Sequence, residues 1–174
     1  MKIRPYRESD RETLKAITVE AFDGVSIDQN IERRFGMVAG HDWRWRKARQ
    51  IEEDIDAPDT AVLVAEDERG EIAAYITMRM DRPAGIGWIP NMSVRAGLRG
   101  QGVGRRLIER ALELFRDAGL ELARIETLDQ NQVGGHLYPA CGFIEVARQI
   151  HFALRLDRRD GIEDPKSGAF HHES

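Results

Sequence analysis

Three glycines at alternate positions are the residues of this chain best suited to chemistry. Gly100, Gly102 and Gly104 follow an apolar run and precede a helical pattern. Glycine permits torsions and close approaches that a side chain would block, so several N–H groups can converge on one anion at a helix start. The helix dipole adds to this attraction, and Arg99 and Arg105 can donate charge-assisted hydrogen bonds. The spacing predicts a turn that binds a phosphate or pyrophosphate.

Two better-known glycine motifs do not fit these letters. A dinucleotide-binding fingerprint requires a third glycine where Arg105 stands, and no Gly-Lys-Ser/Thr follows as a P-loop requires. A glycine loop by itself also fits a plain strand-to-helix turn without a ligand. A surface arginine such as Arg106 is in most proteins simply solvated. The loop alone therefore leaves both interpretations open.

A second segment downstream narrows the interpretation. It runs from Asn131 to Phe143 and places a leucine-tyrosine pair, Leu137 and Tyr138, ahead of a glycine-phenylalanine pair. Together the two segments resemble the sequence pattern of the GNAT N-acetyltransferases. The residues that match in register are Val94, Arg99, Gly100, Gly102, Val103, Gly104, Asn131, Leu137, Tyr138, Gly142 and Phe143. The looser resemblance extends from Ile3 to Leu156, which is most of the chain.

Some residues depart from this pattern. Ala96 stands where the family prefers proline, and Gly134 stands where it prefers alanine. Gly135 follows, and Pro139 comes directly after the tyrosine. Each glycine lowers helix stability by about 1 kcal/mol, and an interior proline removes a hydrogen bond. We therefore expect a short or kinked last helix, which leaves open whether these residues displace Tyr138 from its usual position.

The resemblance implies a fold and a cofactor. The fold class is α/β (mixed α+β), with a central, mostly antiparallel sheet of six or seven strands, helices on both faces and a splay between the two central strands. Acetyl-CoA would lie in that splay, between the strands that end at Val94 and Leu128. The implied cofactor-binding residues are Met92, Ser93, Val94, Arg99, Gly100, Gln101, Gly102, Val103, Gly104, Arg105, Asn131 and Tyr138.

The resemblance also implies a reaction. A primary amine of a small molecule or a peptide attacks the acetyl thioester directly in a ternary complex. Tyr138 inherits the role of general acid toward the coenzyme A sulfur, and Asn131 that of a hydrogen-bond partner of the pantetheine arm. A backbone N–H on the strand before the loop would stabilise the oxyanion. An alternative of another class is a noncatalytic acyl-CoA sensor, which needs the loop but not Tyr138. A nucleotide-binding regulator is disfavoured by the missing fingerprint.

A base is required because an amine resembling lysine has a pKa near 10.4 and is protonated at neutral pH. The strand that enters the loop contains no carboxylate between residues 87 and 94. Glu126 on the next strand is the first candidate, although a solvated or ion-paired role fits it equally well. Asp129 and Asp81 follow, and His136 remains open. Acidic residues in this region suit a cationic acceptor.

Composition places the chain in a broad class. The 174 residues, 41% of them apolar and 32% charged, suffice for one domain with a sizeable core. The net charge of −4 argues against nucleic acid as a main partner. Cys141 has no second cysteine to pair with, and its apolar setting favours a structural thiol over a nucleophile. We expect a cytoplasmic protein without a membrane segment. No metal is expected, since His171 and His172 form no cluster with metal-site spacing.

Several elements must position the candidate site. The patterns predict strands at 3–6, 61–65, 72–78, 87–94, 122–128 and 151–156, and helices from Ser9, with a capping box to Glu12, and from Gly102 to Gly119. Pro90 cannot donate to a sheet ladder, so a bulge or splay is expected there. Residues 23–60 are less regular and are expected to shape the acceptor pocket. We expect one domain at 1–156, a loosely ordered tail at 157–174, and a monomer or homodimer.

Overall fold

The structure is a computed structural model that describes residues 1–156, so the predicted tail at 157–174 lies outside the described residues. The elements in chain order are β1 (Lys2–Pro5), the short helix η1 (Glu8–Asp10), α1 (Arg11–Ala21), α2 (Ile27–Phe35), α3 (Trp43–Asp56), β2 (Thr60–Glu66), β3 (Ile72–Asp81), β4 (Ile86–Ile89), β5 (Met92–Val94), the short helix η2 (Ala96–Leu98), α4 (Val103–Asp117), β6 (Leu122–Ile125) and α5 (Gln132–Ala140). Within residues 1–156, no helix combines the length and apolar character needed to span a membrane.

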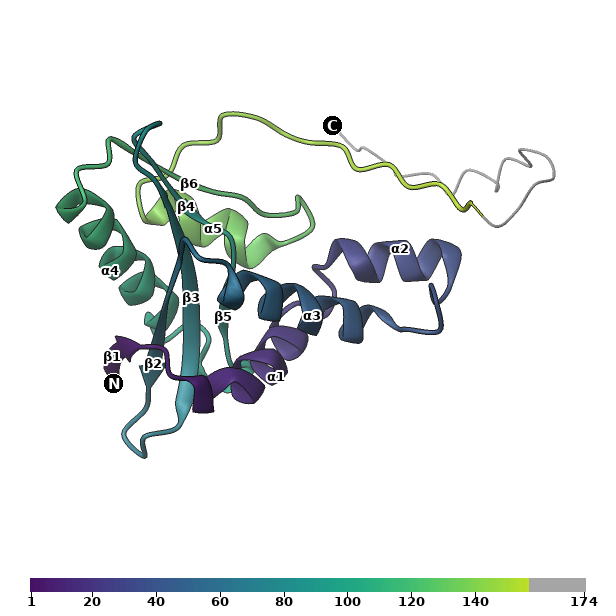
Figure 1. Ribbon diagram of the computed structural model, residues 1–174, viewed down its shortest axis with the longest axis horizontal. Coiled ribbons are helices and arrows are strands. Elements are labelled where there is room, and N and C mark those ends of the chain that lie inside the picture. Colours follow the sequence, from purple (N-terminus) through teal and green to yellow (C-terminus); the bar gives the residue numbers. More distant parts are fainter. Residues whose placement is uncertain (157–174) are drawn as a thin grey trace.

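A six-stranded sheet forms the centre of the molecule (Figure 1). Its order is β1-β2-β3-β4-β6, and β5 pairs with β3 beside β4. All pairings are antiparallel except that of β4 with β6. The mixed, mostly antiparallel sheet predicted from the sequence is therefore confirmed, with six strands in the described residues.

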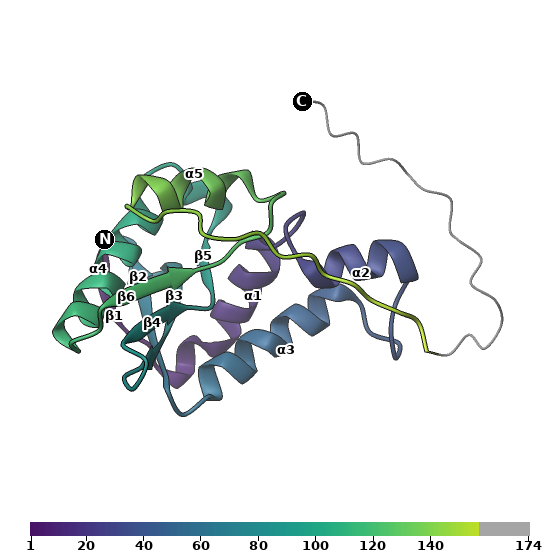
Figure 2. The ribbon, with the colours of Figure 1, turned by 90° about the horizontal axis from the view of Figure 1, so that it is seen from above.

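Helices cover both faces of this sheet (Figure 2). Alternate residues of β3 point to opposite sides, because side chains of a strand alternate between its faces. Ile76 and Met78 pack with α4 in one core, while Tyr75 packs with α1 and α3 in a second core. The apolar face of α4 is buried against the first core through Leu107, Ile108 and its neighbours, as the helical periodicity predicts. α5 contributes Tyr138 and other residues to the same side.

The stretch at 87–94 is divided into two strands. β4 ends at Ile89, Pro90 interrupts the ladder, and Asn91 bridges back to β3, donating its N–H to Thr77 Oγ1 at 3.0 Å and accepting from Thr77 N at 2.8 Å. The prediction of one continuous strand here is wrong, because the stretch forms two strands. The irregularity predicted at Pro90 is confirmed. Beyond this break, within residues 1–156, β5 pairs with β3 only and β6 pairs with β4 only. This loss of pairing is the splay.

Two other strand predictions need correction. β6 ends at Ile125 rather than Leu128, because β4, its only partner strand in residues 1–156, ends opposite it at Ile89. The strand expected at 151–156 is absent, and the chain is extended there without a ladder. Its alternating letters suit a strand, but a strand also requires a neighbouring edge, and no edge lies beside it within the described chain.

The first helix starts later than its letters indicate. α1 begins at Arg11 after the short helix η1, and Ser9 is not its N-cap. Asp10 instead accepts hydrogen bonds from the guanidinium of Arg4, at 2.7 and 3.1 Å, and from Arg7 N at 2.8 Å. The Arg4 hydrogen bonds hold the pKa of Asp10 below its ordinary value. The buried ion pair with β1 therefore fixes where α1 starts.

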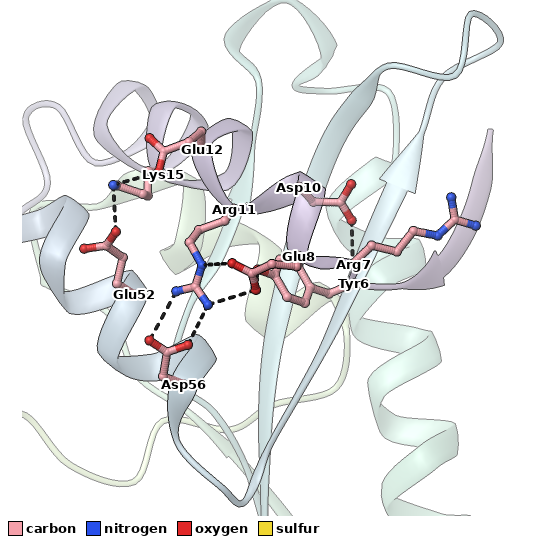
Figure 3. A network of polar contacts seen from close by, with 9 residues as sticks. All are labelled: Tyr6, Arg7, Glu8, Asp10, Arg11, Glu12, Lys15, Glu52 and Asp56. Carbon is pink, nitrogen blue, oxygen red and sulfur yellow. Dashed lines mark hydrogen bonds and ion pairs between the residues drawn. The ribbon is translucent and has the colours of Figure 1, made fainter.

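Ion pairs join α1 to α3 (Figure 3). Arg11 lies between Glu8, at 2.6 Å, and Asp56, also at 2.6 Å. One turn further along, Lys15 bridges to Glu52 at 2.7 Å. Since both cations come from α1 and both distant carboxylates from α3, the two helices are held side by side over the second core.

Candidate active site

The glycine loop joins β5 to α4 and forms the start of that helix. Gly102 is the N-cap with φ of 79°, in the left-handed region that glycine adopts at low cost. The first hydrogen bond of the helix runs from Arg106 N to Gly102 O at 3.1 Å. The N–H groups of residues 103–105 are therefore directed out of the helix start, where an anion can accept them.

Side chains around the loop are partly used to shape it. Arg99 Nε donates to Val94 O at 3.3 Å, and Gln101 Nε2 donates to Gly97 O at 3.1 Å. Arg105 Nη2 donates to Ala140 O at 3.0 Å and so ties the start of α4 to the end of α5. Val103 is buried, which leaves its N–H rather than its side chain for a ligand. The loop thus presents backbone donors within a cationic surface.

β5 borders the loop and has one unpaired edge. It is hydrogen-bonded to β3 through residues 92–94, and within residues 1–156 no strand pairs with its other edge. Ser93 points into the protein, where its Oγ donates to Tyr75 Oη at 3.4 Å. Met92 and Val94 are half-buried on the side of α4. The peptide groups of this edge are available to an extended ligand such as the pantetheine arm.

α5 packs beside the loop and carries the second predicted segment. Asn131 caps the helix, its Oδ1 accepting from Gly134 N at 3.2 Å and its Nδ2 donating to Thr127 Oγ1 at 2.8 Å. A Cβ at position 134 would lie 3.0 Å from both of those side chains and 3.2 Å from the ring of Tyr138. This close approach explains glycine where the family pattern prefers alanine. The contact of Asn131 with pantetheine stays a prediction.

Tyr138 lies one turn further along α5. Its ring meets Phe143 edge-on, with centroids 6.3 Å apart, and burial raises the pKa of its phenol to about 12. Pro139 stands in the last turn of this nine-residue helix, so the short helix that we expected is confirmed. Tyr138 is thus a protonated phenol at neutral pH, beside the loop.

A family model identifies the chain. The model described as the acetyltransferase (GNAT) family matches residues 26–143, which include the loop, the unpaired edge of β5 and Tyr138. The chain belongs to the GNAT acetyltransferase family. It is accordingly a GNAT-type acyltransferase that uses acetyl-CoA. Among curated proteins, none matches it significantly in sequence.

Solved structures show the same fold. A variant of the BH1408 protein from Bacillus halodurans has a TM-score of 0.68 at 17% identity, covering 88% of this chain and all of its own. The aminoglycoside N-acetyltransferase AAC(6')-Iy in complex with CoA has a TM-score of 0.63 at 17% identity, covering 88% and 94%. AAC(6')-IG from Acinetobacter haemolyticus has a TM-score of 0.59 at 16% identity, covering 90% and 100%. The acetyltransferase fold spans the described residues.

The candidate bases of the acetyltransferase are not brought together. Glu126 is exposed just after β6 leaves the sheet, and within residues 1–156 its carboxylate has no ion-pair partner. Asp129, three residues on, is paired with Arg148 at 3.0 Å. Asp81 accepts from Ala84 N at 3.1 Å in the turn after β3, at the opposite end of that strand from the loop. Of these three carboxylates, Glu126 alone has neither an ion-pair nor a hydrogen-bond partner within residues 1–156.

His136, the remaining candidate base, and Cys141, expected to be a structural thiol, both have structural surroundings. His136 is exposed on α5, with Nδ1 2.6 Å from Gln132 O. Cys141 is half-buried, and burial raises the pKa of its thiol, which disfavours a nucleophilic thiolate. Among residues 1–156 no group of histidine, cysteine and carboxylate side chains could hold a metal ion.

A buried polar cluster that was not predicted from the sequence lies on the α3 side of the strand break. Asp54 accepts from Arg79 Nη2 at 2.6 Å and from Asn91 Nδ2 at 3.1 Å. Asn91 Oδ1 in turn accepts from Lys47 Nζ at 3.2 Å, and Lys47 also lies 3.8 Å above the ring of Phe22. These contacts fix Asn91, which immediately precedes β5, so the cluster holds the edge on which the acetyl group is expected.

Lys47 is 8% exposed, and burial lowers the pKa of its amine to about 8. The sequence does carry a sign of this. Trp43, Lys47, Ile51 and Asp54 recur at helical spacing, so the two charged residues share the face of the two apolar ones. Charged residues within an apolar helical face indicate a buried polar cluster.

A surface depression lies between α2 and α3. Its volume is about 260 Å³, and its lining residues are Asp28, Trp45, Arg46, Arg49, Gln50 and Glu53. None of the predicted cofactor residues lines it. Gln130 joins this region to the loop after β6, donating to Gly24 O at 2.6 Å and accepting from Asn30 Nδ2 at 2.9 Å. The irregular stretch at 23–60 therefore lies beside the segment that carries Glu126.

Proposed function

We propose that the chain transfers the acetyl group of acetyl-CoA to a primary amine by direct attack in a ternary complex. The observation that carries this proposal is the position of Tyr138. Its phenol, protonated at neutral pH, is carried by α5, the helix that Arg105 ties to the start of α4. A protein that only binds an acyl-CoA needs the loop but has no use for a proton donor there.

The proposed reaction balances within this site. The amine nitrogen attacks the thioester carbonyl, and an N–H of β5 stabilises the oxyanion that forms. When the carbon–sulfur bond breaks, Tyr138 donates its proton to the departing thiolate. The protonated amine first releases one proton to solvent through Glu126, directly or through water, which frees the nitrogen for attack. The attacking nitrogen then gives its second proton to Glu126 as the amide forms. Return of that proton to the Tyr138 phenolate through water restores both groups after the products leave.

We further propose a small cationic amine as acceptor. Glu126 and Asp129 are exposed carboxylates on the loop that borders α2, and carboxylates attract a protonated amine toward the site. Several structural neighbours are aminoglycoside acetyltransferases, which supports amines of this charge and size. Peptide amines remain in the test as the alternative acceptor class.

The test is release of coenzyme A from acetyl-CoA across aminoglycosides, polyamines, amino acids and peptides. The proposal predicts turnover with a small cationic amine. It also predicts that double-reciprocal plots of the initial velocity, taken at several concentrations of the second substrate, intersect, as a ternary complex requires. Parallel lines would contradict direct attack. Acetyl-CoA binding with no turnover on any acceptor would overturn the enzyme assignment of this site in favour of an acyl-CoA sensor.

A further inference from the structure

A row of three side chains crosses the sheet on the face opposite α4. Arg79 of β3 pairs in register with Trp88 of β4, and Trp88 pairs with Arg124 of β6. The row faces away from α4, because a Cβ on the neighbouring Gly87 would lie 2.5 Å from the ring of Phe115 and successive residues of a strand point to opposite sides. The two guanidinium carbons lie 5.3 and 4.8 Å from the centroid of the Trp88 ring. This Arg-Trp-Arg row therefore gathers two cations around one aromatic side chain.

The row contains hydrogen-bond donors that the protein leaves unused. Arg79 Nε and Trp88 Nε1 are buried, and neither has a hydrogen-bond partner within residues 1–156. Buried donors are almost always paired, because an unpaired donor loses its hydration without replacement. Arg124 is exposed, and in the described part of the chain its guanidinium contacts the indole but makes no ion pair. Asp54 compensates the charge of Arg79 at 2.6 Å, so the charge that remains uncompensated in the row is that of Arg124.

The row lies where this face of the sheet is open. The second core joins β2 and β3 to α1 and α3, and among the described residues it includes none from β4 or β6. The row is also linked to the strand break, since the Asp54 carboxylate accepts from Arg79 at 2.6 Å and from Asn91 at 3.1 Å. Asn91 immediately precedes β5, on whose edge the acetyl group is expected. A ligand on the row would therefore lie beside the site of the proposed transfer.

Glu126 places a charge of the opposite sign next to the row. It follows Arg124 by two residues, a spacing that returns to the same side of an extended chain, and about 7 Å of chain separates the two Cα atoms. Both side chains are exposed, and within residues 1–156 neither belongs to an ion pair. Opposite charges at this separation are complementary to a small molecule that carries both an anionic group and a protonated amine.

We propose that the acceptor of the acetyl group carries a carboxylate, which the Arg-Trp-Arg row binds while the amine of the same molecule faces Glu126. This inference rests on the proposed acetyl transfer and adds one requirement to its acceptor. The planar guanidinium of Arg124 matches a carboxylate, with which it forms charge-assisted hydrogen bonds. An amine without an anionic group leaves the charge of Arg124 unpaired and is therefore the poorer acceptor. The substrate class is accordingly an amino acid or a short compound with the same two charges.

The test compares acceptors that differ in the anionic group alone. Coenzyme A release from acetyl-CoA is measured with a series of straight-chain amino acids and with their carboxamides. We expect the best acid to exceed its amide in kcat/KM by about 10-fold or more, as for a hydrogen bond to a charged group. Arg124→Gln should bring the two values together through a higher KM for the acid, with kcat and acetyl-CoA affinity retained. The control is Arg116→Gln, which removes an exposed arginine near the end of α4 and should keep the preference for the acid.

Binding measured without turnover separates this inference from the proposed function. The acids are titrated into the protein with coenzyme A present while tryptophan fluorescence is followed, and Trp88→Phe identifies the share of Trp88 among the three tryptophans. A Trp88 signal that appears with acids but not with amides, and is lost in Arg124→Gln, would support the row even if no acetyl group were transferred.

Two results would overturn the inference. Transfer to amides as efficient as transfer to acids would contradict the carboxylate requirement and leave the acetyl transfer standing. Acids that give neither a Trp88 signal nor a preference in turnover would contradict binding by the row. Circular dichroism should show unchanged folding in Arg124→Gln, because the side chain is exposed.

Discussion

Gly134 and Gly135 are neighbours in α5, but a Cβ atom added at each position would meet different surroundings. A Cβ at 134 would press on Asn131 and Thr127 at 3.0 Å, while a Cβ at 135 would meet nothing within 4 Å. We expect Gly135→Ala to raise the free energy of unfolding by about 0.5–1 kcal/mol through helix propensity. Gly134→Ala should gain less or lose stability, and it should weaken coenzyme A binding by displacing Asn131. Denaturation and calorimetric titration measure both, and equal stabilisation would contradict the close approach.

Lys47 makes stability depend on pH. Its pKa is lowered to about 8 in the folded state by burial, whereas an unfolded lysine titrates near 10.4. Between these values the unfolded chain binds more protons, so the free energy of unfolding attributable to Lys47 rises with pH, by about 3 kcal/mol in total. The nearby carboxylates Asp28 and Asp54 oppose the shift. We expect Lys47→Met to lose this rise when denaturation is measured from about pH 7 to about pH 10.5, a range that brackets both pKa values.

The control for this measurement is Lys2→Met, which removes an exposed lysine on β1. It should retain the rise seen in the natural chain. Identical pH profiles for Lys47→Met and the natural chain would show that the buried amine is not desolvated as the structure indicates.

Glu126 is proposed as the base, and its removal separates catalysis from a role on the surface. Glu126→Gln should lower kcat by about 10²-fold, within the range of general base catalysis, and should leave the denaturation midpoint unchanged because the side chain is exposed. Glu121→Gln, an exposed carboxylate at the other end of β6, should change neither. An unchanged kcat in Glu126→Gln would return the base to Asp129, His136 or water.

At the scale of single residues, the sequence predicts those that a motif specifies and hides those that depend on packing. The glycine loop and Tyr138 follow from their spacing. The cluster of Lys47, Asp54 and Asn91 does not, since it joins α3 to a strand break far along the chain. Residues that meet only through tertiary structure leave little trace in the sequence. Here the trace is the pair of charged residues on the apolar face of α3.

At the scale of elements, α4 depends on glycine at both ends, with different consequences. Gly102 at its start and Gly119 after its end have φ of 79° and 76°, and a Cβ added at either would meet no atom within 4 Å. Alanine at either position should cost about 1–2 kcal/mol of stability because of left-handed strain. Only Gly102→Ala should also weaken coenzyme A binding, measured by calorimetry. Equal binding by the two variants would show that the helix start does not hold the cofactor.

Elements with a local pattern were predicted well and those that need a partner were not. The amphipathic face of α4 and the hairpin of β2 and β3 follow from periodicity and turn residues. The strand expected at 151–156 has the right alternation but no ladder, because pairing depends on an edge that the letters do not specify. Likewise β6 stops at Ile125, opposite the last residue of its neighbour.

At the scale of the whole molecule, the sheet divides the protein into two functional sides. α4 and α5 bring the glycine loop and Tyr138 to one face, while α1 and α3 hold the polar cluster against the other (Figure 2). The break between β4 and β5 is where the two sides meet. This arrangement could be inferred in outline from the family resemblance, but the polar cluster against the second face could not, because residues 23–60 carry no motif.

The most direct test of the proposed acetyl transfer is the Tyr138→Phe variant, assayed for coenzyme A release with the best acceptor and for acetyl-CoA affinity. We predict that kcat falls by about 10²-fold or more while affinity and folding stay near those of the natural protein, because the phenol acts as proton donor and its ring is retained. The control is Tyr6→Phe, which removes a tyrosine hydroxyl just after β1 that donates to Glu8. This variant should have the kcat and the acetyl-CoA affinity of the natural protein. Turnover unchanged in Tyr138→Phe would contradict the proposed acid and the mechanism that depends on it.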